Sequence, residues 1–289
     1  MPRRKQIKYI DLFCGIGSFH YSFQKLGFKC IMASDIYPPA KETYNLNYSK
    51  TGKEKEFELL DDICKIDPTK LGKYDILCAG FPCQPFSQAG HHLGFADTRG
   101  TMFAEIMRFV KINAPRIVIL ENVKALINHD NGRTITVIKQ NLEAEGYTII
   151  FKVLTCSDYG IPQMRKRVFI VCFKNITVNN IDKFFDLGEY EHKVTLSTFF
   201  NKNFAKETAY TIRCGGRASA ITNRHNWDGY LVDGEEYRLT IEDGLKLQGF
   251  ENFELCGSVT KQWKMLGNTI PTNFTDIIGK QLIKHFDFS

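Results

Sequence analysis

Short apolar runs recur along residues 1–173 and are separated by segments whose apolar residues have helical spacing. The apolar runs are typical of buried strands, and we expect strands at residues 7–12, 29–34, 74–79, 116–120, 147–154 and 168–173. We expect helices at residues 19–26, 101–112 and 134–145, and a last helix from about residue 272 to 286. Buried strands that alternate with helices predict an α/β fold with a mostly parallel, doubly wound sheet.

The regular alternation ends near Lys174. Residues 174–257 are polar, contain glycines and short aromatic segments, and follow neither the helical nor the strand period. We therefore expect one domain from residues 1–173 and 258–289, and a second, smaller domain from residues 174–257. The last helix has a wide apolar face, which predicts that it packs back onto the first domain.

Composition indicates where in the cell the protein is found, but it says little about the activity. The chain is 43% hydrophobic, enough for a substantial core, and no apolar run approaches the roughly 20 residues of a membrane span. The formal charge of +6 is compatible with a polyanionic partner but does not identify one. Nine cysteines without framework spacing, and a basic N-terminus too weakly apolar for a secretory signal, predict an intracellular protein with free thiols. The adjacent His91 and His92 lack metal-site spacing, so no metal is expected.

The first expected strand runs into a glycine turn, FCGIGSF at residues 13–19. Backbone N–H groups at such a helix start suit a polar or anionic ligand group. Gly15 and Gly17 lack the third glycine of the dinucleotide fingerprint. Asp35, at the tip of the second strand, could accept both hydroxyls of a ribose, and Asp62 could accept an adenine amino group. A plain tight turn and solvated strand ends are the alternatives, but together these residues predict an adenosine cofactor without a pyrophosphate.

A cysteine between two prolines follows the apolar run 74–79, in the sequence GFPCQPFS at residues 80–87. Prolines restrict the backbone around Cys83, and ligands gather at the carboxyl edge of a parallel sheet. These turn-forming neighbours favour a reactive thiolate over a thiol buried in the core. Glu121 ends the next expected strand and could protonate a ring nitrogen. Arg165 and Arg167 precede the last strand, where they could clamp a carboxylate or phosphate, or form a basic surface turn.

Six motifs then occur in a characteristic order. They are DLFCGIGSF at 11–19, GFPCQPFS at 80–87, ENV at 121–123, QMRKR at 163–167, RLT and LQGF within 238–250, and GNTIP at 267–271. In these motifs the chain resembles the DNA (cytosine-5) methyltransferases, especially the compact bacterial restriction–modification type. The resemblance covers residues 7–173 and 238–286, and it implies the S-adenosylmethionine-dependent methyltransferase fold with a target recognition domain at 174–257.

The resemblance implies a covalent mechanism on cytosine. Cys83 matches the nucleophile that adds to carbon 6, and Glu121 matches the acid that hydrogen-bonds N3 and the exocyclic amine. Arg165 matches a partner of the target base and of Glu121, with Arg167 as its supporting neighbour. Carbon 5 takes a methyl group from S-adenosylmethionine, which leaves S-adenosylhomocysteine. A duplex hides carbon 6, so the base is flipped out, and residues 87–101 are expected to close over it.

The resemblance also assigns binding residues. Those expected in the cofactor pocket are Phe13, Gly15, Gly17, Asp35, Ile36, Asp62, Ile63, Pro82, Met102 and Asn268. Those expected at double-stranded DNA are Gln84, Ser87, Thr211, Arg213, Arg217, Arg224, His225 and Asn226. Arginine favours guanine and asparagine favours adenine, although several of these side chains could contact phosphates only. The small second domain predicts a short, palindromic recognition site.

The sequence departs from the family pattern at two places. Asp35 stands where the family usually has glutamate, and Glu242-Asp243 stand where it commonly has Arg-Glu. One alternative is a related enzyme that acts on transfer RNA, against which the GFPCQPFS form counts. Another is a non-catalytic DNA-binding protein that retains the fold, against which the intact Cys83, Glu121 and Arg165 count. We expect a cytoplasmic monomer, with any cognate restriction endonuclease encoded separately.

Overall fold

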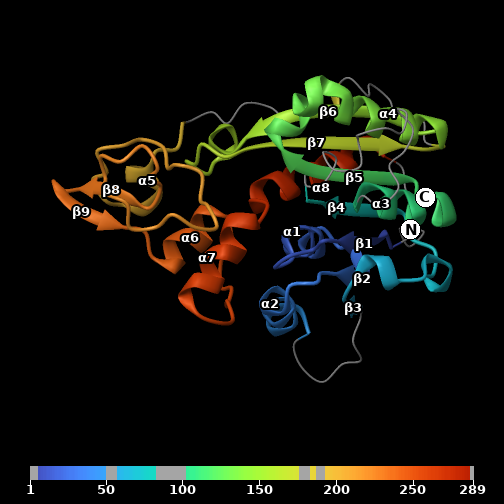
Figure 1. The fold of residues 1–289 in the computed structure, drawn as a ribbon, viewed down its shortest axis with the longest axis horizontal. Helices are drawn as coiled ribbons and strands as arrows, with labels where there is room; N and C mark the ends of the chain where they lie inside the picture. The colour runs from blue at the N-terminus through green and yellow to red at the C-terminus, as the bar shows by residue number, and fades with distance from the viewer. Residues whose placement is uncertain (1–5, 50–56, 83–101, 176–182, 187–192, 287–289) are drawn as a thin grey trace, which may run out of the picture.

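The computed structural model describes residues 6–49, 57–82, 102–175, 183–186 and 193–286. A central sheet carries helices on both faces, and a smaller part lies beyond one end of the sheet (Figure 1). The sheet and its helices comprise β1 (Lys8–Leu12), α1 (Ser18–Lys25), β2 (Lys29–Ser34), α2 (Pro38–Tyr48), β3 (Glu58–Leu60), η1 (Ile63–Lys65), η2 (Pro68–Lys70), β4 (Ile76–Gly80), α3 (Met102–Asn113), β5 (Ile117–Val123), η3 (Lys124–Ile127), η4 (His129–Gly132), α4 (Arg133–Ala144), β6 (Thr148–Thr155), η5 (Cys156–Tyr159) and β7 (Lys166–Phe173). They are followed by α5 (Leu196–Phe200), β8 (Gly229–Val232), β9 (Glu235–Arg238), α6 (Ile241–Leu247), α7 (Val259–Asn268) and α8 (Thr272–His285).

The sheet has seven strands in the order β3-β2-β1-β4-β5-β7-β6. Strands β1 to β5 pair in parallel, whereas β7 runs antiparallel to both β5 and β6. The expected α/β fold with a mostly parallel sheet is therefore confirmed. Because β7 is reversed, its first residues lie at the carboxyl end of β5, where Arg167 is the register partner of Val123.

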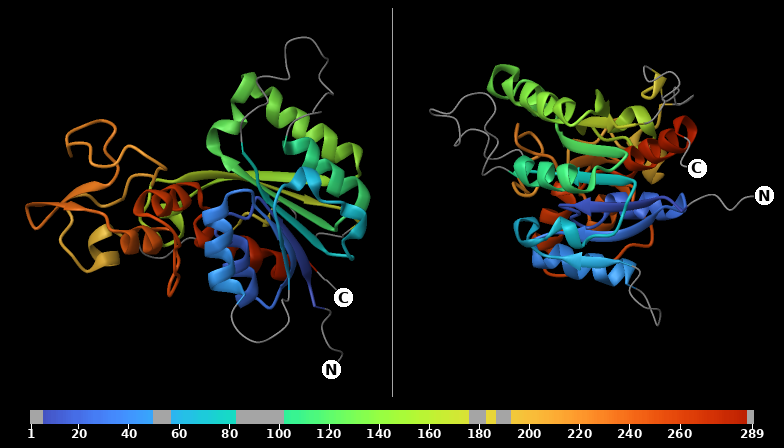
Figure 2. Two further views of the ribbon diagram at one scale, coloured as in Figure 1. Left: turned by 60° about the horizontal axis from the view of Figure 1, so that its bottom comes forward. Right: turned by 90° about the vertical axis from the view of Figure 1, so that its right-hand side faces the viewer.

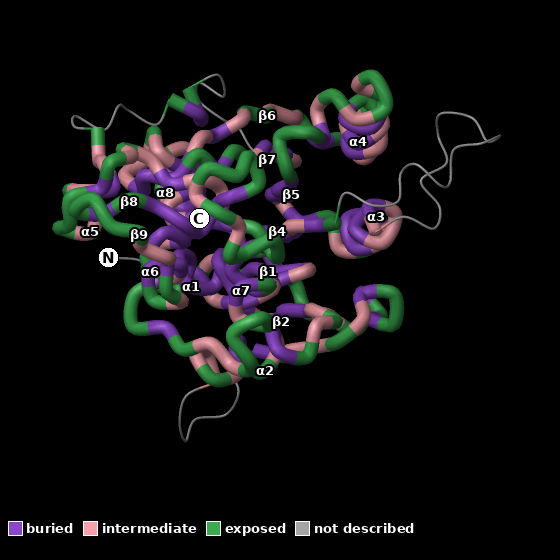
Figure 3. The backbone as a smooth tube through the Cα atoms, turned by 60° about the vertical axis from the view of Figure 1, so that its left-hand side comes forward, coloured by how far each residue is buried: buried purple, intermediate pink, exposed green. Residues whose placement is uncertain are grey.

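Each face of the sheet is covered by a different set of helices. Ile76 and Cys78 of β4 belong to the hydrophobic cluster that includes α1 and α8, whereas Leu77 and Ala79 belong to the cluster that includes α3 and α4. Figures 2 and 3 show these helices on opposite sides of the strands. Burial on both faces explains why the strands read as continuous apolar runs.

Helix α8 packs against α1, as its apolar face predicts. At Gly279 the two helices approach so closely that an added Cβ would lie 2.4 Å from Leu26 and 3.1 Å from Phe23. The hydroxyls of Ser22 and Thr275 are hydrogen-bonded at 2.6 Å across the same contact. This packing returns the end of the chain to the sheet.

Helices α2 and α7 were not expected from the sequence. Helix α2 begins with two prolines, a residue type suited to the first turn, and α7 buries Trp263, Met265 and Leu266. The two helices meet where the Thr43 hydroxyl contacts the Met265 sulfur at 3.5 Å. The buried face of α2 includes Thr43, so its local apolar pattern is weak, whereas the apolar face of α7 is well marked and was overlooked.

The smaller part contains α5, the β8–β9 hairpin and α6, with α7 between it and the sheet (Figure 1). Asp243, at one of the two departures from the family pattern, completes a capping box at the start of α6. Its Oδ2 accepts the Thr240 N–H at 2.8 Å and the Tyr237 hydroxyl at 2.6 Å. The expected domain boundaries at residues 174 and 257 stay predictions.

Within the residue ranges given above, no helix has both the length and the apolar character needed to cross a bilayer.

Candidate functional site

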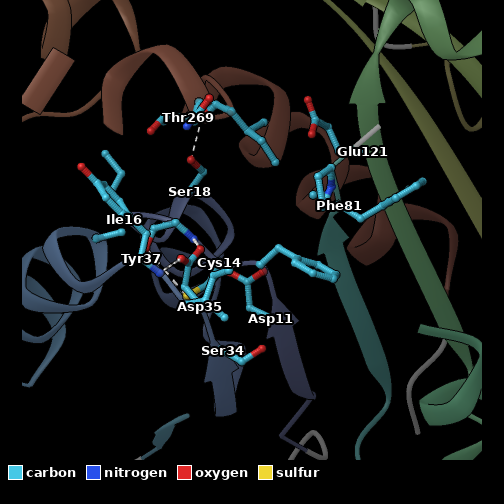
Figure 4. A pocket seen from close by; sticks show the side chains of 18 of the residues that line it. Asp11, Cys14, Ile16, Ser18, Ser34, Asp35, Tyr37, Phe81, Glu121 and Thr269 are labelled. Carbon is cyan, nitrogen blue, oxygen red and sulfur yellow. Dashed lines mark hydrogen bonds between the residues drawn. The ribbon is translucent and has the colours of Figure 1, made fainter. Parts of the chain in front are cut away.

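A cavity of about 600 Å³ lies at the carboxyl edge of the parallel strands (Figure 4), within the usual size range of small-molecule sites. It is lined by nine of the ten residues expected at a cofactor: Phe13, Gly15, Asp35, Ile36, Asp62, Ile63, Pro82, Met102 and Asn268. Glu121 and Arg167 line the same cavity. One hollow thus brings together the expected cofactor residues and two of the expected catalytic residues.

Gly17 is the remaining member of the expected set, and it shapes the turn behind the cavity. Its φ is +88°, and an added Cβ would lie 2.5 Å from the Tyr48 ring and 2.8 Å from the Tyr44 ring. The Tyr48 hydroxyl donates to the Gly17 carbonyl at 2.8 Å. A side chain at this position would therefore both strain the backbone and push α2 away.

Asp35 holds the glycine turn from the adjacent strand. Its carboxylate accepts the Gly15 N–H and the Tyr37 N–H, each at 2.8 Å. Burial raises the pKa of Asp35, and the two backbone hydrogen bonds oppose that rise. Asp62 is partly exposed and caps η1 by accepting the Cys64 N–H at 3.0 Å, a bond that lowers the pKa of Asp62. Each carboxylate retains lone pairs with which it can accept hydrogen bonds from a ligand.

Asp11 is a cavity residue that the sequence analysis did not identify. It lies on β1, is 1% exposed, and its Oδ2 has no hydrogen-bond partner among the described residues. Burial, and secondarily the charge of Asp35, raises the pKa of Asp11 well above its usual value. A buried carboxyl oxygen without a partner is costly, so it indicates a ligand that supplies a cation or a donor. The available signal was an acid inside the apolar run IKYIDL.

The opposite wall is the segment after α7. Ser18 Oγ donates to the Ile270 carbonyl at 2.6 Å and so fixes this segment to α1. Gly267 packs directly on another backbone, because an added Cβ would lie 2.5 Å from both Arg213 C and Cys214 N. The Cys214 thiol also donates to Asn268 Oδ1 at 2.9 Å. The cavity wall therefore contacts the segment that carries the expected DNA-binding residues.

Glu121 presents a buried carboxyl to the cavity from the end of β5. Arg167 Nε lies 2.8 Å from Glu121 Oε1, but the contact lacks hydrogen-bond geometry, and Oε1 has no hydrogen-bond partner in the described ranges. Burial raises the pKa of Glu121, while the charges of Arg167 and then Arg165 lower it. A carboxyl with a raised pKa and an unsatisfied oxygen can donate a proton to, or accept a hydrogen bond from, a bound base.

The two arginines contact different groups in the structure. Arg165 is 1% exposed and donates to three carbonyls, those of Ile212 at 3.1 Å, Gly267 at 2.9 Å and Thr269 at 2.7 Å. Arg167, rather than Arg165, is the ion-pair partner of Glu121. Arg165 instead joins the start of β7 to the cavity wall and to the smaller part, because these carbonyls need donors where the three segments meet.

Cys83, Gln84 and Ser87 lie outside the described residues, as does the segment 87–101 that was expected to close over a base. Their roles stay predictions from the sequence.

The residues expected to read DNA differ in their surroundings. Arg213, Arg224 and His225 are exposed, and Arg224 Nε lies 3.1 Å from His225 Nε2. Asn226 is buried, and its amide closes a turn with the Gly229 carbonyl and N–H at 2.9 and 3.0 Å. Its amide is therefore engaged in folding the chain, which does not favour the expected contact with adenine. Arg217 is held by other side chains, and Thr211 is half-buried.

A sequence model described as C-5 cytosine-specific DNA methylase matches residues 7–212. The chain is 36% identical over 288 residues to the Type II methyltransferase M.NgoBI of Neisseria gonorrhoeae, with 91% of this chain and 89% of that protein covered. It is 30% identical over 320 residues to the Type II methyltransferase M.HhaI of Haemophilus parahaemolyticus, with 98% and 96% covered.

Solved structures have the same fold. The Dnmt2 methyltransferase of S. pombe superposes with a TM-score of 0.71 at 17% identity, over 96% of this chain and 99% of that chain. A putative DNA modification methyltransferase encoded within an E. coli prophage superposes with a TM-score of 0.69 at 15% identity, over 97% and 99%. At these identities the likeness concerns the fold alone.

Proposed function

Since the chain belongs to the C-5 cytosine-specific DNA methylase family and is a DNA (cytosine-5) methyltransferase of the restriction–modification type, we propose that it methylates one short duplex site. In this proposal S-adenosylmethionine is the methyl donor, the target cytosine is flipped out, and Cys83 forms a transient bond to it. The enzyme acts as a monomer inside the cell, with any cognate endonuclease encoded separately.

The charges around the cavity suit a cationic donor. Among the described residues, its lining includes the carboxyl groups of Asp11, Asp35, Asp61, Asp62 and Glu121, against the side-chain cations of Arg167 and Lys264. The unpartnered Oδ2 of Asp11 suits an ammonium group, and Asp35 and Asp62 suit ribose and adenine donors. When bound, S-adenosylmethionine supplies an electrophilic methyl group. Loss of that methyl also removes the sulfonium charge, so the acidic lining favours the donor over the product.

The chain's own residues then act on the cytosine. The Cys83 thiolate adds to carbon 6, while the Glu121 carboxyl protonates N3, and the electron density of the ring moves to carbon 5. Arg167 orients the Glu121 carboxyl. After methylation, a water molecule takes the carbon-5 proton, the Cys83 thiolate leaves carbon 6, and N3 returns its proton to Glu121, which restores the aromatic ring.

The position of Glu121 is the observation that carries this proposal. Its carboxyl lines the same cavity as the expected cofactor residues, and its register partner on β4 is Gly80. Cys83 follows Gly80 by three residues in the sequence. A nucleophile, an acid and a methyl donor therefore fit at one edge of the sheet, as addition to a pyrimidine requires.

Bisulfite sequencing tests the proposal. A plasmid is recovered from an expression host without cytosine methylation of its own, and the Cys83→Ser variant serves as the matched control. We expect conversion-resistant cytosines at one short motif with the wild type and none with the variant. Methylation of transfer RNA in preference to duplex DNA, with both substrates assayed side by side, would support the RNA alternative. Complete conversion of the plasmid from the wild type, together with no methylation of transfer RNA, would contradict both.

A further inference from the structure

A cationic, exposed loop spans residues 213–227, which we call the recognition loop. It carries Arg213, Arg217 and Arg224, and contains no Asp or Glu. Residues 213–218 and 222–225 are exposed. Exposed arginines without intervening acids suit a polyanion, because each phosphate contact adds favourable electrostatic free energy.

A buried acid, Asp228, directly follows the last residue of the recognition loop and contacts the loop. Asp228 is fully buried, and both of its oxygens accept from the Ala218 N–H, at 3.3 and 3.2 Å. Ala218 has a φ of +63°, so this N–H is held in a conformation that non-glycine residues rarely adopt. A buried carboxylate thus fixes the middle of the recognition loop.

Two arginines share the same carboxylate. Arg238 Nη1 lies 3.3 Å from Asp228 Oδ1, and Arg217 Nε lies 3.6 Å from Oδ2. Arg238 also pairs with Glu236, whereas the Arg217 guanidinium also lies over the Trp263 ring, 4.9 Å from its centroid. The Arg217 side chain stays 36% exposed. The Nε side of the Arg217 guanidinium is therefore held by Asp228, and the rest of the group can contact solvent or a ligand.

The loop is also fixed at its base. Trp227 Nε1 donates to the Gly215 carbonyl at 2.9 Å, and the Trp227 and Trp263 rings meet edge to face at 5.2 Å. Trp263 belongs to α7, whose end forms the cavity wall at Asn268. Helix α7 therefore fixes the position of the recognition loop relative to the cavity.

We propose that Asp228 is a positioning residue for DNA recognition, which fixes the recognition loop and presents Arg217 to a phosphate of the duplex. The inference rests on the proposed function and adds a division of labour within the loop. Arg217, which is held by Asp228 and Trp263, contacts the phosphate backbone of the DNA. Arg213 and Arg224, which have no such anchor on a buried side chain within the described part of the chain, remain the candidates for reading base edges.

The direction in which one substitution changes DNA affinity distinguishes a positioning role from a purely electrostatic one. Asp228→Asn preserves size but removes a negative charge, so long-range electrostatics alone predicts tighter DNA binding. Positioning predicts that cognate binding weakens about tenfold, since the loop loses its anchor. Binding is measured by fluorescence anisotropy with a duplex that carries the site mapped by bisulfite sequencing, and with a duplex in which that site is scrambled. We expect a smaller difference between the two duplexes for the variant than for the wild type.

Four further measurements complete the test. Hydrogen exchange should show faster exchange at residues 213–227 in Asp228→Asn, while the Kd for S-adenosylhomocysteine stays within about twofold of the wild type. Glu236→Gln, which removes only the exposed partner of Arg238, should leave DNA binding unchanged. Arg217→Ala should reduce the slope of log K against log salt by about one and weaken both duplexes alike.

The outcomes separate this inference from the proposed function. If the wild type methylates a motif and Asp228→Asn binds its cognate duplex as tightly or more tightly, with unchanged discrimination, the positioning role is overturned and the proposed function stands. If Arg217→Ala changes discrimination but not the salt slope, Arg217 reads a base, and the phosphate assignment is overturned. If the wild type methylates no motif, the proposed function fails and this inference fails with it.

Discussion

Arg167 and Glu121 meet across the antiparallel pair β5–β7, with Nε 2.8 Å from Oε1. The ion pair lies at the cavity, where burial raises the pKa of Glu121 and Arg167 opposes that rise. The pair thus places at the cavity a carboxyl whose pKa is raised and whose Oε1 has no hydrogen-bond partner among the described residues. This balance between burial, which raises the pKa of Glu121, and the two arginine charges, which lower it, underlies the first prediction.

Arg167→Met should raise the pKa of Glu121 further, because burial is then opposed only by the more distant charge of Arg165. In the proposed mechanism Glu121 acts in its protonated form, and it loses its proton as pH rises through its pKa. The alkaline limb of the kcat/KM profile should therefore move to higher pH, with kcat reduced about 100-fold through poorer orientation. Glu121→Gln should abolish this limb. An unmoved limb in Arg167→Met would assign it to another group.

Asp11→Asn should stabilise the ligand-free protein while weakening the cofactor site. The folded-state pKa of Asp11 lies above its unfolded value, so the folded state retains the proton to higher pH, and stability falls as pH rises between the two values. Removal of the charge should raise Tm at pH 7, with the gain vanishing at low pH. The Kd for S-adenosylhomocysteine, measured by calorimetry, should increase about tenfold.

Glu143→Gln on α4, which changes an exposed carboxyl, is the matched control and should alter neither quantity. If Asp11→Asn lowers Tm at pH 7 and leaves the Kd unchanged, the carboxyl is structural and its assignment to a ligand is wrong.

Gly267→Ala should impair both binding sites together. The added methyl would lie 2.5 Å from backbone atoms of Arg213 and Cys214, and backbone cannot rotate out of the way as a side chain can. We expect weaker binding of both S-adenosylhomocysteine and DNA, with a loss of stability of about 1–3 kcal/mol. Gly215→Ala, whose added methyl meets nothing within 4 Å, is the control. Equal behaviour of the two variants in urea unfolding and binding would show that this contact is unimportant.

Arg165→Met should destabilise the fold by about 3–5 kcal/mol, because three buried carbonyls lose a charged donor. The neighbouring exposed change Lys166→Met should fall within about 0.5 kcal/mol of the wild type. Urea denaturation measures both. A stable Arg165→Met variant that has lost only activity would return Arg165 to the catalytic role that the sequence suggested.

Much of the sheet could be predicted because burial on two faces produces apolar runs such as YDILCA at residues 74–79. The direction of β7 could not, since an apolar run looks the same in either direction. Helix α2, with the sequence PPAKETYNLNY, was missed because its buried face is small and includes Thr43 and Tyr44.

In the candidate site, too, some features could be predicted from the sequence and others could not. Motif positions identified nine residues that line the cavity, and most of them follow the ends of β1 to β4, which meet at one edge of the sheet. That Arg167 and not Arg165 forms the ion pair with Glu121 was not predictable, since the two side chains are chemically identical and Arg165 is distinguished by carbonyls from distant segments. Asp11 was missed because an acid within a strand has no local pattern that marks its oxygen as unpaired.

The most direct measurement of the central claim is covalent trapping. The wild type and Cys83→Ser are incubated with S-adenosylmethionine and a duplex that carries 5-fluorocytosine at the mapped target, because fluorine at carbon 5 blocks the release step. We predict a denaturant-resistant complex with the wild type alone, and a modified peptide that contains Cys83 in mass spectrometry. The account would be contradicted if the complex still formed with Cys83→Ser. It would also be contradicted if a wild-type enzyme that methylates normal DNA formed no complex.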